Sequence, residues 1–247
     1  MCKYFISSFF LGVIALNLYS QKKSISQSLK DSTRYKTGYG LRIGADISRP
    51  ILSVFDKSYQ GIELVGDYRI LKNWYIATEL GYEKETTFEE YTTSTSRGSF
   101  FRIGANYNAY KNWLDMNNEI FIGARYGFAL FNQSLDNYTP NVNIGTTPLP
   151  GDLVNNTAPY FPSSTKYNVQ KESGLISHWI EAQIGMKVET MKNLFLGAGF
   201  SYKIMINIDH QMNFKSLYSP GFNRVFESNT GFGFFYTISY LIPFVNK

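Results

Sequence analysis

The stretch that most constrains the fold lies near the end of the chain, where residues 230–244 read TGFGFFYTISYLIPF. Large apolar side chains alternate there with mostly small ones. The apolar face carries Phe232, Phe234, Tyr236, Ile238, Tyr240, Ile242 and Phe244. A period of two is the signature of a β-strand, because successive side chains of a strand point to opposite faces. One face is too apolar for water, so this stretch predicts a strand that closes a β-barrel with its apolar face in lipid.

Seven earlier segments show the same alternation of an apolar face with a face of glycines and charged residues. They are residues 38–48, 61–71, 74–84, 99–110, 119–131, 175–190 and 194–207. The links alternate between short ones (72–73, 111–118 and 192–193) and longer ones (49–60, 85–98, 132–174 and 208–229). Short turns at one end and long loops at the other are typical of outer-membrane barrels.

We therefore expect an all-β fold, an eight-stranded antiparallel up-and-down transmembrane β-barrel with short periplasmic turns and longer extracellular loops. The closing strand should pair with the seventh strand and with the first. Ten strands remain an alternative if the segment 132–174 contains a further hairpin.

The N-terminus has the layout of a secretory signal peptide. Residues 1–3 give a short basic start, residues 5–18 an apolar core, and Ser20 a small residue before a plausible cleavage point. A membrane anchor is the alternative, but the apolar core is shorter than the roughly 20 residues that a helical span needs. We expect a signal peptide at 1–20, a flexible periplasmic lead-in at 21–37 and a barrel at 38–247, exported to the cell outer membrane.

Alternation alone leaves open which face meets lipid, because a soluble lipocalin-like barrel would turn the apolar face inward. Glycine recurs on the polar face, and small residues suit the narrow interior of an eight-stranded barrel. Aromatic residues gather near the strand ends, as in the girdles that mark lipid interfaces. The expected interface aromatics are Tyr39, Trp74, Tyr82, Tyr126, Tyr202 and Phe244. Both features favour the transmembrane interpretation over the soluble one.

The polar face also carries charges of both signs, and buried charges need partners. We expect them to form a charge network that fills the lumen. Its members are Arg42, Asp46, Glu63, Asp67, Arg69, Glu79, Arg102, Arg125, Glu181, Lys187 and Lys203. A filled lumen predicts poor conduction, whereas a gated pore or an ion pathway is the alternative. The net charge of +5 comes with no basic run or stripe, which argues against nucleic acid as a partner.

Candidate catalytic residues are few. A lipid-modifying acyl hydrolase needs an activated nucleophile and a base, and His178 could serve only if a Ser or Thr of a neighbouring strand reached it. His210 lies in a predicted loop. The one cysteine, Cys2, falls within the expected signal peptide. No metal-ligand spacing is present, so we expect neither a metal nor a cofactor, and an enzyme is the less favoured hypothesis.

The segment 132–174 is rich in Asn, Thr, Pro and Ser and includes the aromatic pair Tyr160 and Phe161. A loop of this length is usually functional or disordered. We consider it a possible contact surface for an external ligand or partner, with an ordinary variable loop as the alternative.

The alternating strands, the Lys-Asn turns before Trp74 and Leu194, and the aromatic closing strand carry a resemblance. Over residues 39–244 the chain resembles the small outer-membrane β-barrel proteins of Gram-negative bacteria, and within them an uncharacterised group of β-barrel porins. The resemblance implies outer-membrane lipid and the barrel-assembly machinery as partners, and no catalytic residues. The function expected is structural or adhesive, or that of a narrow small-solute channel. The alternatives are the acyl hydrolase and a soluble periplasmic binding protein.

Overall fold

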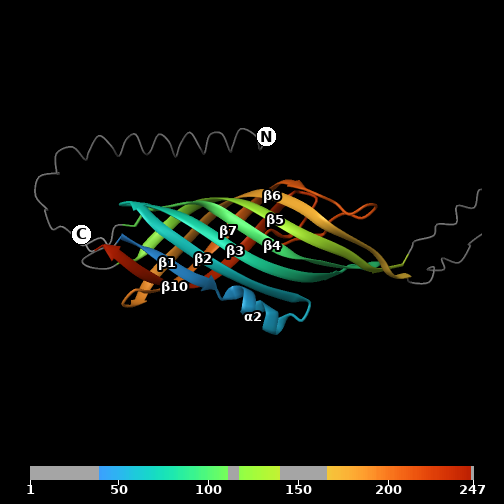
Figure 1. Cartoon of the computed structure of the whole chain (residues 1–247), viewed down its shortest axis with the longest axis horizontal. Helices are drawn as coiled ribbons and strands as arrows, with labels where there is room; N and C mark the ends of the chain where they lie inside the picture. Colours follow the sequence, from blue (N-terminus) through green and yellow to red (C-terminus); the bar gives the residue numbers. More distant parts are fainter. Residues whose placement is uncertain (1–38, 111–116, 140–165, 246–247) are drawn as a thin grey trace, which may run out of the picture. The chain divides into compact units, whose positions relative to one another are not determined.

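The structure is a computed structural model that describes residues 39–110, 117–139 and 166–245. Eight strands close into an antiparallel barrel with the ring order β1-β10-β7-β6-β5-β4-β3-β2 (Figure 1). Their bounds are β1 Tyr39–Asp46, β2 Tyr59–Leu71, β3 Trp74–Phe88, β4 Thr92–Asn108, β5 Glu119–Tyr138, β6 Lys166–Met191, β7 Leu194–Ile208 and β10 Thr230–Val245. A helix, α2 (Ser48–Phe55), joins β1 to β2, and two short strands, β8 (Tyr218–Ser219) and β9 (Asn223–Arg224), lie between β7 and β10.

This ring confirms the predicted eight-stranded antiparallel up-and-down barrel. Strand β10 pairs with β7 and with β1, as expected for the closing strand. The short links β2–β3, β4–β5 and β6–β7 share one end of the barrel, which we call the turn end, and the remaining links share the other, the loop end. The expected signal peptide and most of the lead-in lie outside the described residues and remain predictions. In the described ranges, no helix is long and apolar enough to cross a membrane.

The two faces of the barrel wall differ sharply in chemistry. Large apolar side chains are exposed on the outside of the strands, for example Leu80 on β3, Leu130 on β5 and Phe200 on β7. The inward positions carry the charged residues together with glycine, serine and a few aromatics. A soluble lipocalin-like barrel would have the opposite arrangement, whereas an apolar outer wall is what a barrel in a bilayer requires.

The strands extend further at the loop end than predicted. Residues 85–98 were expected as a loop, but β3 and β4 run through them and leave only residues 89–91 as a link. Thr86 and Thr95 lie opposite each other there, with their hydroxyl oxygens 3.1 Å apart. Threonine favours strands, so the polar composition of this segment reflects strands that are polar on both faces rather than a loop.

The same correction applies to the ends of the segment 132–174. Strand β5 continues to Tyr138 and β6 begins at Lys166, so the outer parts of the predicted loop form a ladder (Figure 1). The pairs include Ser134 with Lys171. The ring therefore contains eight strands, and residues 140–165, with Tyr160 and Phe161, lie outside the described residues.

Helix α2, Ser48–Phe55, takes up much of the segment 49–60 that was predicted as a loop. Pro50, just beyond the predicted first strand, lies in the first turn of the helix, where the fixed φ of proline is favourable and its missing N–H costs nothing. Just before the helix, Asp46 Oδ1 accepts the backbone N–H of Ser48 at 2.9 Å.

The position of α2 follows from the shortness of β1. Strand β1 ends at Asp46, so residues 59–63 of β2 and 230–236 of β10 have no β1 residue beside them. The helix contacts both of these strands. Ser53 Oγ accepts the backbone N–H of Gly61 at 3.0 Å, which satisfies one group on the exposed edge of β2. The helix thus covers a gap that the short strand leaves in the barrel wall.

Candidate functional site in the barrel interior

A cluster of five charged side chains crosses the middle of the barrel. Arg102 on β4 is its centre, with Nε 2.7 Å from Glu79 Oε2 and Nη1 3.2 Å from Glu181 Oε2, and it also contacts Glu63. Arg125 Nε lies 3.1 Å from Glu79 Oε1. All five are buried and come from five consecutive strands, β2 to β6. We call this group the central cluster; its ion pairs connect opposite sides of the wall.

A second group of charges lies nearer the turn end. Arg42 Nε is 2.6 Å from Asp67 Oδ1, and its Nη1 is 2.8 Å from Glu119 Oε1. Lys187 contacts the other oxygen of Asp67. The Arg42 guanidinium also stacks over the ring of Tyr75 at 4.8 Å. These contacts connect β1, β2, β5 and β6, so the bore is crossed a second time.

Three of the predicted network residues lie apart from these groups: Arg69, Asp46 and Lys203, the last of which contacts the loop between β7 and β10. Arg69 donates to the backbone carbonyl oxygen of Leu71 at 3.3 Å and packs over the ring of Tyr39 at 5.5 Å. Asp46 accepts backbone N–H groups, including that of Tyr236 at 3.1 Å. All eleven charged residues named from the sequence are buried in the interior. The structure divides them between two clusters and individual roles, and their function as one network remains a prediction.

The loop between β7 and β10 folds into the barrel. Its residues 217–225, which include β8 and β9, are named the hairpin plug here. Phe222 at its tip is fully buried and packs against Trp179 with the ring centroids 6.1 Å apart. Phe100, Ala129 and Met205 complete this apolar cluster inside the wall. The plug is therefore part of the barrel interior rather than a free loop.

Two fully buried wall residues hold the backbone of the hairpin plug. Glu83 Oε2 accepts the N–H of Gly221 at 2.8 Å and the hydroxyl of Tyr218 at 2.7 Å. Lys203 Nζ donates to the carbonyl oxygen of Gly221 at 2.6 Å. Burial, and then the Glu83 carboxylate, raise the pKa of Tyr218 well above its ordinary value, so its hydroxyl remains a donor. An acid and a base on opposite walls thus bind the backbone N–H and C=O of one residue, Gly221.

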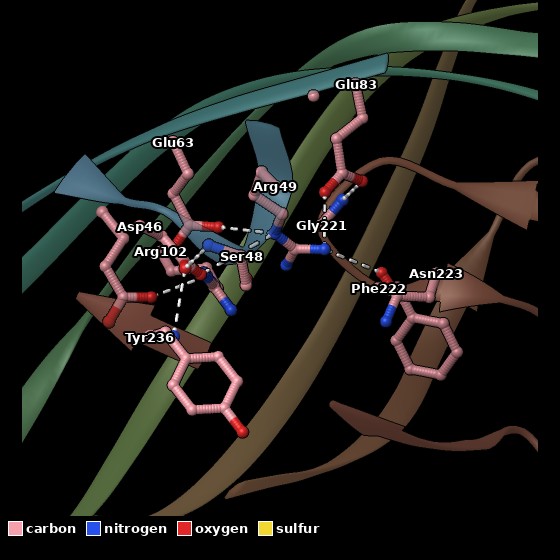
Figure 2. Close-up of polar contacts among 12 residues, drawn as sticks. Asp46, Ser48, Arg49, Glu63, Glu83, Arg102, Gly221, Phe222, Asn223 and Tyr236 are labelled. Carbon is pink, nitrogen blue, oxygen red and sulfur yellow. Dashed lines mark hydrogen bonds and ion pairs between the residues drawn. The ribbon is translucent and has the colours of Figure 1, made fainter. Parts of the chain in front are cut away.

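Arg49 joins α2 to this arrangement (Figure 2). It extends from the first turn of the helix into the interior, where Nη1 lies 2.9 Å from Glu83 Oε1 and 3.4 Å from Asn223 Oδ1 of the plug. Its Nε is 3.3 Å from Glu63 Oε2, a member of the central cluster. One buried arginine therefore contacts the wall, the plug and the central cluster.

Little space remains between these groups. A cavity beside the central cluster measures about 30 Å³, and one beside Arg42 about 20 Å³. Cavities of this size hold a few water molecules. Larger depressions, of about 230 and 260 Å³, lie at the loop end. The interior as it stands accommodates water rather than a solute.

Sequence reasoning missed Arg49 and the plug because both fall in segments expected to be loops. Pro50 could have indicated the helix, because proline is common in the first turn of a helix as well as at the end of a strand. For the plug it is the run Tyr218-Ser-Pro-Gly-Phe222, in which two aromatics flank a turn and need burial.

His178 lies on the outer face of the wall. Its Nδ1 is 2.7 Å from the hydroxyl of Tyr126, and its ring packs on Phe128 at 5.1 Å. Its cross-strand neighbour on β7 is Asn207. No Ser or Thr hydroxyl in the described part of the chain hydrogen-bonds to His178. His210 accepts a backbone N–H from Ser216 in the β7–β10 loop.

Five of the predicted interface aromatics are exposed on the outer wall. These are Trp74, Tyr82, Tyr126, Tyr202 and Phe244. Tyr39 is half-buried under Arg69. Their place at a lipid interface remains a prediction. Across the described ranges, no group of three His, Cys, Asp or Glu side chains could hold a metal ion.

Fold and interior together define a class, an eight-stranded β-barrel with an apolar outer wall and a filled, plugged bore. The chain belongs to the family described as a domain of unknown function, DUF6048, which matches residues 1–247. No curated protein matches it.

Among solved structures, the chain is similar to Ail, the attachment invasion locus protein of Yersinia pestis. The identity is 9% and the TM-score 0.40, and the match covers 83% of this chain and 98% of that one. It is also similar to Neisserial surface protein A, with 12% identity and a TM-score of 0.40 over 83% and 97%.

Proposed function

We propose that this protein is an outer-membrane β-barrel with a closed bore and a structural or adhesive role at the cell surface. The observation that carries the proposal is the double closure of the interior, by the central cluster and by the hairpin plug. The barrel acts as an anchor, and the long hairpins β3–β4 and β5–β6 project from its loop end. An external ligand or partner would bind at this end, including the segment 132–174.

The outer wall supports the membrane part of the proposal. Leu64, Ile103, Ile122, Ile184 and Leu196, on five different strands, are each between 44% and 59% exposed. A soluble monomer rarely exposes a continuous apolar surface, because it costs free energy in water. Export by a cleaved signal peptide at 1–20 and insertion by the barrel-assembly machinery belong to the same proposal.

Gel mobility of the membrane fraction tests the membrane part. A folded barrel resists detergent, so the unboiled protein should migrate differently from the boiled one and should stay with the membrane after a salt wash. Release by salt with no mobility shift would contradict it.

Planar bilayers test the closed bore. The purified, refolded protein should give no steady single-channel current, because the charges that fill the bore cannot leave without breaking their pairs. Large, steady currents would contradict the proposal and would favour the porin-like interpretation.

A narrow small-solute channel is the second candidate. The plug favours it, because it belongs to a loop and its removal would widen the loop end. Loop segments open at lower free energy than wall strands. A channel would also require the central cluster to open, and currents that appear only after removal of both closures would favour this candidate.

A further inference from the structure

Two like charges lie side by side on the outer wall, on strands β3 and β4. Lys84 on β3 and Arg97 on β4 are direct cross-strand partners. In the described part of the chain neither side chain forms an ion pair, and the other cross-strand neighbours, Gln60 and Asn132, are uncharged. Like charges directly opposite each other destabilise a sheet. An anion bound between them would attract both cations and offset their repulsion.

The site has a third cation and a concave shape. Lys171 on β6 lies opposite Ser134 on β5 and, with Lys84 and Arg97, lines a depression of about 230 Å³. It also forms no ion pair with any described residue. Three cations from three strands therefore line one open, polar depression.

Two carboxylates that line the same depression are already engaged. Asp136 accepts hydrogen bonds from the hydroxyls of Thr95 at 2.5 Å and Ser134 at 2.8 Å. Glu172 accepts the backbone N–H of Met212 at 2.8 Å. They hold the walls of the depression together, and neither lies within ion-pair distance of the three cations.

The height of the depression on the wall identifies the kind of anion. On β3 the outward residue before Lys84 is Tyr82, and on β5 the one before Asn132 is Leu130; both are exposed and apolar or aromatic. The basic residues thus lie directly beyond the apolar wall, at the level where lipid headgroups meet a barrel. Guanidinium and ammonium groups are the usual ligands of phosphate.

We propose that Lys84, Arg97 and Lys171 form a binding site for the phosphate-bearing headgroup of an outer-leaflet lipid. This inference rests on the proposed membrane location. The phosphate lies between Lys84 and Arg97 and removes their repulsion, while the acyl chains of the same lipid run along the apolar wall below.

The test uses the full mature chain in dodecyl maltoside, titrated with dioleoyl phosphatidic acid and separately with dioleoyl phosphatidylcholine, and bound lipid is counted by native mass spectrometry. The site variant combines Lys84→Gln, Arg97→Gln and Lys171→Gln. The matched control combines Lys57→Gln, Lys72→Gln and Lys192→Gln, three exposed lysines elsewhere that give the same change in net charge.

We expect the affinity for phosphatidic acid to fall at least about tenfold in the site variant, since the variant loses all three basic groups that attract the headgroup. The control should stay within about twofold. An equal loss in both variants, or no loss, would overturn the proposal. Inorganic phosphate that displaces phosphatidic acid at equal concentration would overturn the choice of a lipid.

The mobility shift on boiling separates this inference from the proposed function. If both variants shift as the wild type does but show no headgroup preference, only the phosphate site fails. If the wild type itself does not shift, the membrane barrel fails and the lipid site fails with it.

Discussion

The central cluster and the hairpin plug both close the bore, but they are built from different parts of the chain. The central cluster consists of charged side chains on five wall strands, with Arg102 at its centre. The plug is a loop whose tip, Phe222, is held by apolar packing and whose backbone is held by Glu83 and Lys203.

The difference lies in what has to break for each closure to be lost. Removing the central cluster means separating buried charges in the wall itself, which costs several kcal/mol per unpaired ion. Removing the plug means undocking a loop, and loops open locally at a fraction of the global free energy of unfolding. The plug can therefore move while the barrel stays folded, but its movement alone leaves the bore closed.

The largest effect is expected for Arg102→Met. Methionine keeps a long, unbranched side chain at this position but leaves Glu63, Glu79 and Glu181 without their shared cation. The free energy of unfolding should fall by about 3–5 kcal/mol, the usual cost of removing one partner from a buried ion pair. Urea unfolding in lipid vesicles, followed by the mobility shift on gels, measures it.

The matched control for this substitution is Lys57→Met in the link between α2 and β2. Lys57 is exposed and forms no ion pair with the described residues, so the free energy of unfolding of this variant should stay within about 0.5 kcal/mol of the wild type. Equal effects of the two substitutions would show that the central cluster contributes nothing beyond an ordinary surface cation.

A smaller and more local effect is expected for Phe222→Ala. The substitution removes a fully buried ring that packs with Trp179 and Phe100. Such truncations lower the stability of the packed segment by about 3 kcal/mol or more. Because the plug is a loop, the loss should appear as faster hydrogen exchange at residues 217–225, with the boiled-to-unboiled mobility shift intact.

Phe226→Ala is the control for Phe222→Ala, since Phe226 lies in the same loop and is 53% exposed. Its exchange should match the wild type. Steady currents from Phe222→Ala in planar bilayers would contradict the view that the central cluster closes the bore without the plug.

The wall of this barrel was predictable because the alternation within each strand assigns every residue to the inner or the outer face. Inward charges such as Arg102 and Glu181 and outward residues such as Phe200 follow from alternation within each strand. The pairing of these inward charges was not predictable, because it depends on the register of neighbouring strands and on the stagger of the barrel. Arg102 and Glu181, for example, are 79 positions apart.

The helix and the plug were missed for a different physical reason. Both depend on long-range geometry, namely the gap beside the short β1 and the free space in the bore at the loop end. Arg49 and Phe222 fill these spaces, but nothing near them in the sequence shows that the spaces exist. The polar ladders of β3–β4 were missed because alternation of hydrophobicity disappears where both faces of a strand carry polar side chains.

A moderate effect is expected for Lys203→Met. The substitution keeps most of the side-chain volume and removes the bond from Nζ to the carbonyl oxygen of Gly221. Hydrogen bonds that involve a charged group contribute about 2 kcal/mol, so the plug should open more often and exchange faster at 217–225. Lys192→Met, an exposed turn lysine, serves as the control. Unchanged exchange in Lys203→Met would mean that the apolar tip alone holds the plug.

The smallest effect, and the sharpest division between wall and plug, is expected from Tyr218→Phe compared with Tyr59→Phe. Both hydroxyls donate to Glu83, at 2.7 Å from Tyr218 on the plug and at 3.0 Å from Tyr59 on the wall strand β2. Each lost hydrogen bond should cost about 1 kcal/mol, because Glu83 keeps Arg49 and its other donors.

Tyr218→Phe should speed hydrogen exchange at residues 217–225 and leave the urea midpoint of the barrel unchanged, since its bond exists only while the plug is docked. Tyr59→Phe should lower the urea midpoint, because its bond joins two wall strands and persists when the plug opens. If the two variants gave the same pattern, the plug and the wall would unfold together, and the bore would have one closure rather than two.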